Sequence, residues 1–84
     1  MPRIIVERTL DEPLTDEVIE ALMARMSPCF GIYNVKWVRS SLSTDRKRMV
    51  CEYDAADAES VRAVQREAGA PFDRAWTASV FGAS

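Results

Sequence analysis

The sequence contains no histidine, and this absence removes a large share of enzyme chemistry. Histidine is the commonest general base near neutral pH and the commonest metal ligand in proteins. Catalytic sites of the Ser-His-Asp and Cys-His types are excluded, as are HExxH metal sites. Acid–base chemistry or metal binding would have to rely on carboxylates, backbone groups, water or a thiolate.

Cysteine is scarce, and only Cys29 and Cys51 are present. Neither lies in a CxxC pair, so the common zinc and redox motifs are missing. We expect both to be small buried hydrophobic side chains in a reducing compartment. A disulfide between them and a reactive thiol are the alternatives.

Long apolar runs are missing too, because none approaches the ~20 residues needed to span a bilayer. No charged leader precedes an apolar segment, so we expect a cytoplasmic protein with no membrane partner. The net charge is −2. Nucleic acid is not expected as a partner, because phosphate binding needs a basic surface.

The chain is long enough for one domain, residues 1–84, and too short for two. Hydrophobic residues make up 48% and charged residues 29%, which is typical of a globular protein rather than a disordered one. A domain of this size buries only about 60% of its unfolded surface, so its stability margin is thin. Oligomerisation is a common remedy.

The first part of the chain predicts a strand followed by a helix. Arg3–Thr9 is rich in β-branched residues and indicates a strand. Thr15 is a helix N-cap candidate ahead of an apolar stripe at helical spacing. We expect the helix to end or kink near Ser27, because Pro28 cannot donate a backbone hydrogen bond. Gly31 is the expected stop beyond it.

The rest of the chain predicts a hairpin, a second helix and a last strand. The strands are expected at Tyr33–Leu42, Lys47–Ala55 and Asp73–Phe81, and the helix at Ala58–Ala68, between an N-cap at Asp57 and a stop at Gly69. The resulting β-α-β-β-α-β order is that of a ferredoxin-like α+β domain with a four-stranded antiparallel sheet. Right-handed crossovers put both helices on one face of the sheet. Two copies that pack their uncovered faces together would form a dimeric α+β barrel.

Strand alternation assigns the hairpin side chains to the two faces. A turn at Thr44–Asp45 pairs Trp37 with Glu52, and a turn one residue later changes the partners but keeps each residue on its face. The more apolar set, which includes Cys51 and Tyr53, is expected under the helices. The uncovered face would carry Trp37, Arg39, Ser41, Val50 and Glu52, joined by Ile5 and Glu7.

The predicted ligand-binding residues on that face are Glu7, Trp37, Arg39, Ser41 and Glu52. We expect Glu7, Arg39 and Glu52 to form a coupled cluster in which Arg39 is the only cation. The alternative is a structural ion-pair network at a dimer interface. Trp37 would stack on a ligand or anchor that interface.

Three stretches resemble a known family: IVERT at 5–9, VKWVRSSLS at 35–43 and CEYDAADAESVRAVQREAGAPFDR at 51–74. They are similar to a domain-of-unknown-function family of small bacterial proteins that includes a dimeric, ferredoxin-like nickel-binding protein. The resemblance implies the fold, a homodimer and nickel as a cofactor. Ni(II) favours imidazole nitrogen, however, and this chain has none. Ser41 stands where the family pattern has an aromatic residue, which could enlarge the space between the sheets.

The leading hypothesis is a non-catalytic homodimeric protein that binds a small ligand or a metal ion in the inter-sheet space. One alternative is a small α+β barrel enzyme of the oxygenase or isomerase type. Glu7 or Glu52 would then be the acid or base, with Arg39 stabilising an anion. The other alternative is a non-catalytic interaction module.

Overall fold

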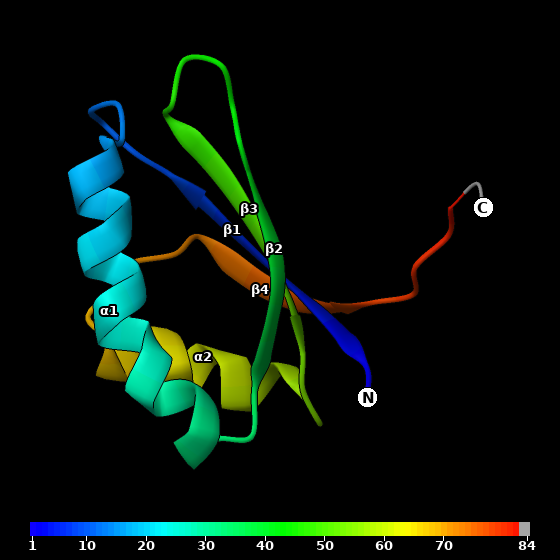
Figure 1. Cartoon of the computed structure of the whole chain (residues 1–84). Coiled ribbons are helices and arrows are strands. Elements are labelled where there is room, and N and C mark those ends of the chain that lie inside the picture. The colour runs from blue at the N-terminus through cyan, green and yellow to red at the C-terminus, as the bar shows by residue number, and fades with distance from the viewer. Residues whose placement is uncertain (83–84) are drawn as a thin grey trace.

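The chain folds into four strands and two helices in the predicted order. The computed structural model describes residues 1–82. Its elements are β1 (Arg3–Thr9), α1 (Asp16–Ile32), β2 (Lys36–Leu42), β3 (Arg48–Asp54), α2 (Ala58–Glu67) and β4 (Arg74–Ala78). Both helices lie on one side of the sheet, and the segment that follows β4 leads away from them (Figure 1). The predicted α+β fold is confirmed.

The strands form one antiparallel sheet in the order β2-β3-β1-β4. Alternation along β1 buries Ile4 and Val6 completely beneath the helices, while Ile5 and Glu7 point to the other face. The largest fully buried side chains are those of Tyr53, Ile4, Met26, Gln65, Val6, Val61 and Val64. Within residues 1–82, no helix is long and apolar enough to cross a membrane.

Helix α1 begins as predicted and ends later than predicted. The Thr15 hydroxyl accepts a hydrogen bond from the Val18 amide at 3.2 Å, so the N-cap is confirmed. Of the two outcomes expected near Ser27, an end or a kink, the end is wrong, because the helix continues through Pro28 to Ile32, one residue beyond Gly31.

Packing explains why the helix passes through Pro28. Met26 is buried in the core, and the Phe30 ring lies 6.1 Å from the Tyr53 ring, centroid to centroid. These contacts hold the last turns against the sheet, so the loss of one backbone donor is tolerated. The left-handed residue that follows the helix is Asn34 (φ 53°), not Gly31.

Helix α2 is capped at both ends as the sequence predicts. The Asp57 carboxylate accepts hydrogen bonds from the Ser60 amide and hydroxyl, each at 2.8 Å. These bonds hold the pKa of Asp57 below its usual value, with the backbone donor as the largest cause. Gly69 follows the helix at φ 65°, a conformation that favours glycine.

The turn between β2 and β3 is longer than the two residues predicted at Thr44–Asp45. The Ser43 amide donates to the Arg48 carbonyl at 2.9 Å, and Arg46 adopts a positive φ of 63°. Asp45 Oδ1 accepts from the Ser43 hydroxyl at 2.6 Å and from a backbone amide two residues later. Such side-chain bonds stabilise a longer loop, and the strand partners are those of the later turn.

A β-bulge interrupts the pairing of β2 with β3. Arg39 lies opposite Glu52, but Trp37 lies opposite Tyr53, so Val38 is an extra residue on β2. Because of this extra residue, the β2 side chains before Arg39 point to the opposite faces from those that simple alternation predicts. Trp37 therefore shares the helix-covered side with Tyr53.

Candidate functional site

The candidate site is the sheet face that the helices leave uncovered, referred to below as the open face. Its side chains include Arg3, Ile5 and Glu7 of β1, Arg39 and Ser41 of β2, Val50, Glu52 and Asp54 of β3, and Arg74 and Trp76 of β4. Trp76 is 45% exposed and Val50 is 38% exposed in the single chain. The face thus combines exposed apolar groups with arginines and carboxylates.

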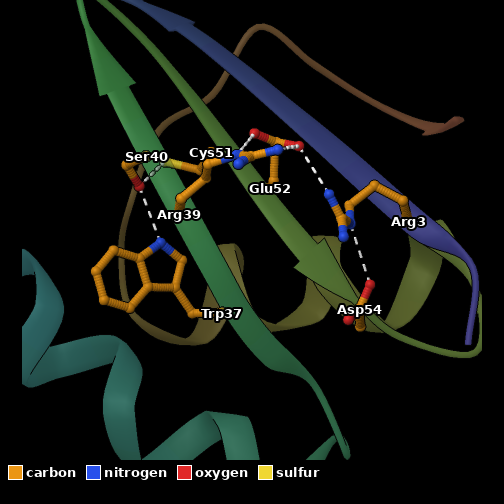
Figure 2. Close-up of polar contacts among 7 residues, drawn as sticks. All are labelled: Arg3, Trp37, Arg39, Ser40, Cys51, Glu52 and Asp54. Atoms are coloured by element: carbon orange, nitrogen blue, oxygen red, sulfur yellow. Dashed lines mark hydrogen bonds and ion pairs between the residues drawn. The ribbon is translucent and has the colours of Figure 1, made fainter. Parts of the chain in front are cut away.

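An ion-pair network crosses three strands of the open face. Glu52 lies between two arginines: Arg39 Nε donates to its Oε2 at 2.5 Å, and Arg3 Nη1 donates to its Oε1 at 2.8 Å. Arg3 Nε also donates to Asp54 Oδ1 at 3.1 Å. Figure 2 shows the four side chains in a row from Arg39 to Asp54.

The network stabilises the charged forms of Glu52 and of the two arginines. The hydrogen bond from Arg39 holds the pKa of Glu52 below its usual value, and Arg3 adds to the effect. The pKa of Arg3 is raised, first by its bond to Asp54 and then by its bond to Glu52, and the bond to Glu52 raises the pKa of Arg39. Glu52 is therefore ionised at neutral pH and is a weak proton acceptor.

Glu7 belongs to a different group from Arg39. Its Oε2 accepts a hydrogen bond from Trp76 Nε1 at 2.8 Å and lies 3.4 Å from Arg74 Nε. The predicted three-residue cluster therefore holds for Arg39 with Glu52, while no contact among residues 1–82 ties Glu7 to it. The expectation that Arg39 is the only cation is wrong, because Arg3 and Arg74 also carry pairs on this face.

Trp37 does not lie on the open face, contrary to the prediction. The Val38 bulge turns its indole towards α1, where it lines a groove with Met23, Ala24, Ser27, Phe30, Val35 and Lys36. Trp37 Nε1 donates to the Ser40 hydroxyl at 2.9 Å, and that hydroxyl donates to Cys51 Sγ at 3.0 Å (Figure 2). The aromatic group on the open face is Trp76.

Ser41 and Cys51 are placed as expected, whereas Cys29 is less buried than expected. Ser41 lies opposite Val50 on the open face and helps to line a shallow hollow with Leu42, Ser43 and Arg48. Cys51 is buried and Cys29 is half-buried, and both are free thiols. The alternative of a disulfide between them is therefore wrong.

The open-face residues do not fit a nickel site within one chain. Among the residues described, no group of three or more cysteine, aspartate or glutamate side chains could hold a metal ion. Glu7, Glu52 and Asp54 each already pair with an arginine. A cation would have to displace a guanidinium to reach these oxygens.

The ion pairs of Arg3 and Arg74 are not among the contacts predicted from the sequence. Alternation alone places Arg3 beside Ile5 and Glu7 on β1, so its face could have been inferred. Its partners Glu52 and Asp54 could not, because they depend on the register between β1 and β3.

Residues 5–77 match the family model described as nickel responsive protein SCO4226-like. The crystal structure of SCO4226 from Streptomyces coelicolor A3(2) superposes with a TM-score of 0.85 at 14% identity, covering 95% of this chain and 99% of that one. No curated protein matches the chain. At that identity the superposition shows a shared fold, and the family model shows the membership: this chain belongs to the SCO4226-like family of nickel-responsive proteins.

Proposed function

We propose that this protein is a non-catalytic homodimeric binding protein that holds a small ligand between the open faces of two copies. The observation that supports this proposal most strongly is the composition of the open face. Trp76 and Val50 are exposed on this face. The same face carries arginines whose guanidinium groups are held in place by ion pairs with carboxylates. Apolar groups favour burial by a second sheet, and the charged groups favour a polar ligand.

The apolar part of the face supports the homodimer. Apolar surface left in water costs roughly 25 cal/mol per Å², so covering Trp76, Val50 and Ile5 is favourable. Two more apolar side chains follow β4, Val80 at 58% and Phe81 at 92% exposed. Their segment leads away from the helices, so a second copy on the open face could cover part of it (Figure 1).

The charged part favours a small organic ligand over a bare metal ion. Each open-face carboxylate already has a guanidinium partner, whereas Arg39 and Arg74 are 63% and 71% exposed and keep donors free for a ligand. Arginine donors suit carboxylate or phosphate groups. The ligand that this arrangement favours carries negative charge and a flat or apolar part that Trp76 can cover.

The enzyme alternative receives less support from the geometry. Glu52 is held ionised by Arg39, and Glu7 is engaged by Trp76 and Arg74. A general acid or base needs a pKa near the working pH and access to substrate. Neither carboxylate meets both conditions in the single chain.

Two measurements test the proposal. Sedimentation analysis at micromolar concentration should give twice the 9.4 kDa of one chain. Thermal melts against a panel of small organic anions and divalent metals should show stabilisation by at least one anion, because a ligand that binds only the native state raises the melting temperature. Trp76→Ala should reduce the shift, whereas the matched variant Trp37→Ala should leave it in place. A clean monomer, or a panel with no response, would reject the proposal.

A further inference from the structure

One arginine at the hairpin end of the open face has no carboxylate partner. Arg48 begins β3, lies opposite Thr9 of β1 and is exposed on the same face as Val50. The hairpin holds its backbone, because its amide donates to the Ser43 hydroxyl at 3.0 Å and its carbonyl accepts from the Ser43 amide at 2.9 Å. Its guanidinium forms no ion pair among residues 1–82. Arg48 therefore adds a positive charge without a fixed partner to this end of the face.

Arg48 and Arg74 line the same small polar pocket. Its volume is about 60 Å³, and Glu7 and Thr9 of β1 lie between the two arginines in the sheet. Glu7 is already engaged by Trp76 Nε1 and by Arg74 Nε. The donors left for a ligand are the Arg48 guanidinium, the Nη groups of Arg74 and the Thr9 hydroxyl. Such a set suits an anionic group.

Two other charged residues line this pocket. Arg8 is 3% exposed beneath the helices and its Nη2 donates to Gln65, so its guanidinium is not available to a ligand on the open face. Asp73 precedes β4, is exposed, and forms no ion pair within the described part of the chain. Its carboxylate opposes an anion in the pocket, so its removal should favour one.

An apolar hollow of about 280 Å³ adjoins the polar pocket. Arg48 and Val50 line both, and Ser41, Leu42 and Ser43 complete the hollow. Ser41 lies opposite Val50 on the edge strand β2, so its small side chain leaves room beside the valine. An apolar hollow with donors at one end suits a small ligand that has an apolar body and one polar end.

We propose that the ligand of the open face is a small aromatic carboxylate, held between Arg48 and Arg74 with its ring in the hollow beside Ser41. This inference rests on the function proposed above and names the class of ligand and its place on the face. A guanidinium donates two parallel hydrogen bonds to a carboxylate. Because facing sheets pack about 10 Å apart, a planar ring fits between them where a bulkier group would force them apart.

Binding is tested on the full chain with benzoate and two matched controls, benzamide and acetate. Benzamide keeps the ring without the charge, and acetate keeps the carboxylate without the ring. Benzoate should bind saturably and more tightly than either by roughly tenfold or more, because it combines a charged hydrogen bond with apolar burial. Benzoate that binds no better than a control, or not at all, would overturn this ligand class. The function proposed above survives that result if another anion of its panel raises the melting temperature.

Matched variants locate the site. Arg48→Gln should weaken benzoate binding by roughly tenfold or more, the effect of a hydrogen bond to a charged group. Lys47→Gln removes an adjacent exposed charge outside both hollows and should change binding by less than about twofold, since solvent screens it. Ser41→Phe should weaken binding by filling the hollow, and Asp73→Asn should strengthen it. Equal weakening by Arg48→Gln and Lys47→Gln would overturn the site, because it would mean diffuse attraction to a basic hairpin.

Nuclear Overhauser effects test the placement in the wild-type protein. Ring protons of bound benzoate should give effects to the methyl groups of Val50 and Leu42. Effects to the Ile5 methyl groups and the Trp76 ring instead would place the ligand elsewhere on the open face. That result would overturn this inference and leave the function proposed above standing.

Discussion

Arg39 on β2 lies directly opposite Glu52 on β3, but Glu52 is shared with Arg3, which is the better buried of the two arginines. The side chain of Arg3 is 19% exposed and bridges Glu52 to Asp54, whereas that of Arg39 is 63% exposed and has one partner. Exposed pairs contribute little because water screens them. The network should therefore depend on Arg3 more than on Arg39.

The first prediction compares Arg3→Ala with Arg39→Ala in chemical denaturation. Arg3→Ala should lower the free energy of unfolding more, because it leaves two half-buried carboxylates without their shared cation. Arg39→Ala leaves Glu52 paired with Arg3. A double-mutant cycle with Glu52→Gln should give the larger coupling energy for Arg3. The reverse ranking would contradict this account of the network.

The second prediction concerns pH. The pKa of Glu52 is lowered in the folded state, so its stabilising contribution is complete above its unfolded pKa of about 4.3 and is lost as the pH falls through the folded value. The free energy of unfolding should fall below about pH 4.3, and less steeply in Glu52→Gln. Glu20→Gln is the control, since Glu20 is exposed and forms no ion pair among the described residues. Identical pH profiles for wild type and Glu52→Gln would disprove the assignment.

The third prediction is weak binding of Ni(II) at neutral pH. No imidazole is available, and the carboxylates of the open face are paired with arginines. Isothermal titration should show no saturation at equimolar metal. Tight stoichiometric binding would mean that carboxylates from two copies combine, and Glu52→Gln and Asp54→Asn would then identify which of them bind the metal.

The fourth prediction places the dimer contact on the open face. Val50→Lys introduces a charge among apolar groups that a second copy should cover, so the dimer dissociation constant should rise by roughly tenfold or more. Ile32→Lys is the control, because Ile32 is 74% exposed at the far end of α1. Sedimentation across a concentration series measures both. Equal weakening by the two variants would remove the open face as the contact.

Local signals in the sequence predicted the fold well. The alternation in β1, the N-caps at Thr15 and Asp57 and the left-handed Gly69 depend on neighbours in the chain, and all are confirmed. They fix the type and order of the elements. Right-handed crossovers then leave one sheet face open, as Figure 1 shows.

The candidate site was harder to predict because it depends on register. One extra residue, Val38, moves Trp37 to the other side of the sheet, and hydrophobic pattern alone does not reveal a bulge. The partners of Arg3 and Glu7 come from strands far away in sequence. Arg8 follows the alternation of Ile4 and Val6, but a charged residue at a core position is not expected from composition.

The last prediction concerns Pro28, which lies inside α1 rather than after it. A proline there lacks the amide that would bond to the carbonyl four residues earlier, and an interior proline costs about 3 kcal/mol relative to alanine. Core contacts of Met26 and Phe30 hold the helix together despite this loss.

Pro28→Ala should therefore restore a hydrogen bond, with part of the gain offset by the greater freedom of the unfolded chain. The expected increase in the free energy of unfolding is about 1–3 kcal/mol by urea denaturation. Ser27→Ala, at the neighbouring exposed position, should change it by less than about 0.5 kcal/mol. An unchanged or lower stability for Pro28→Ala would mean that the last turns of α1 are not regular helix in solution.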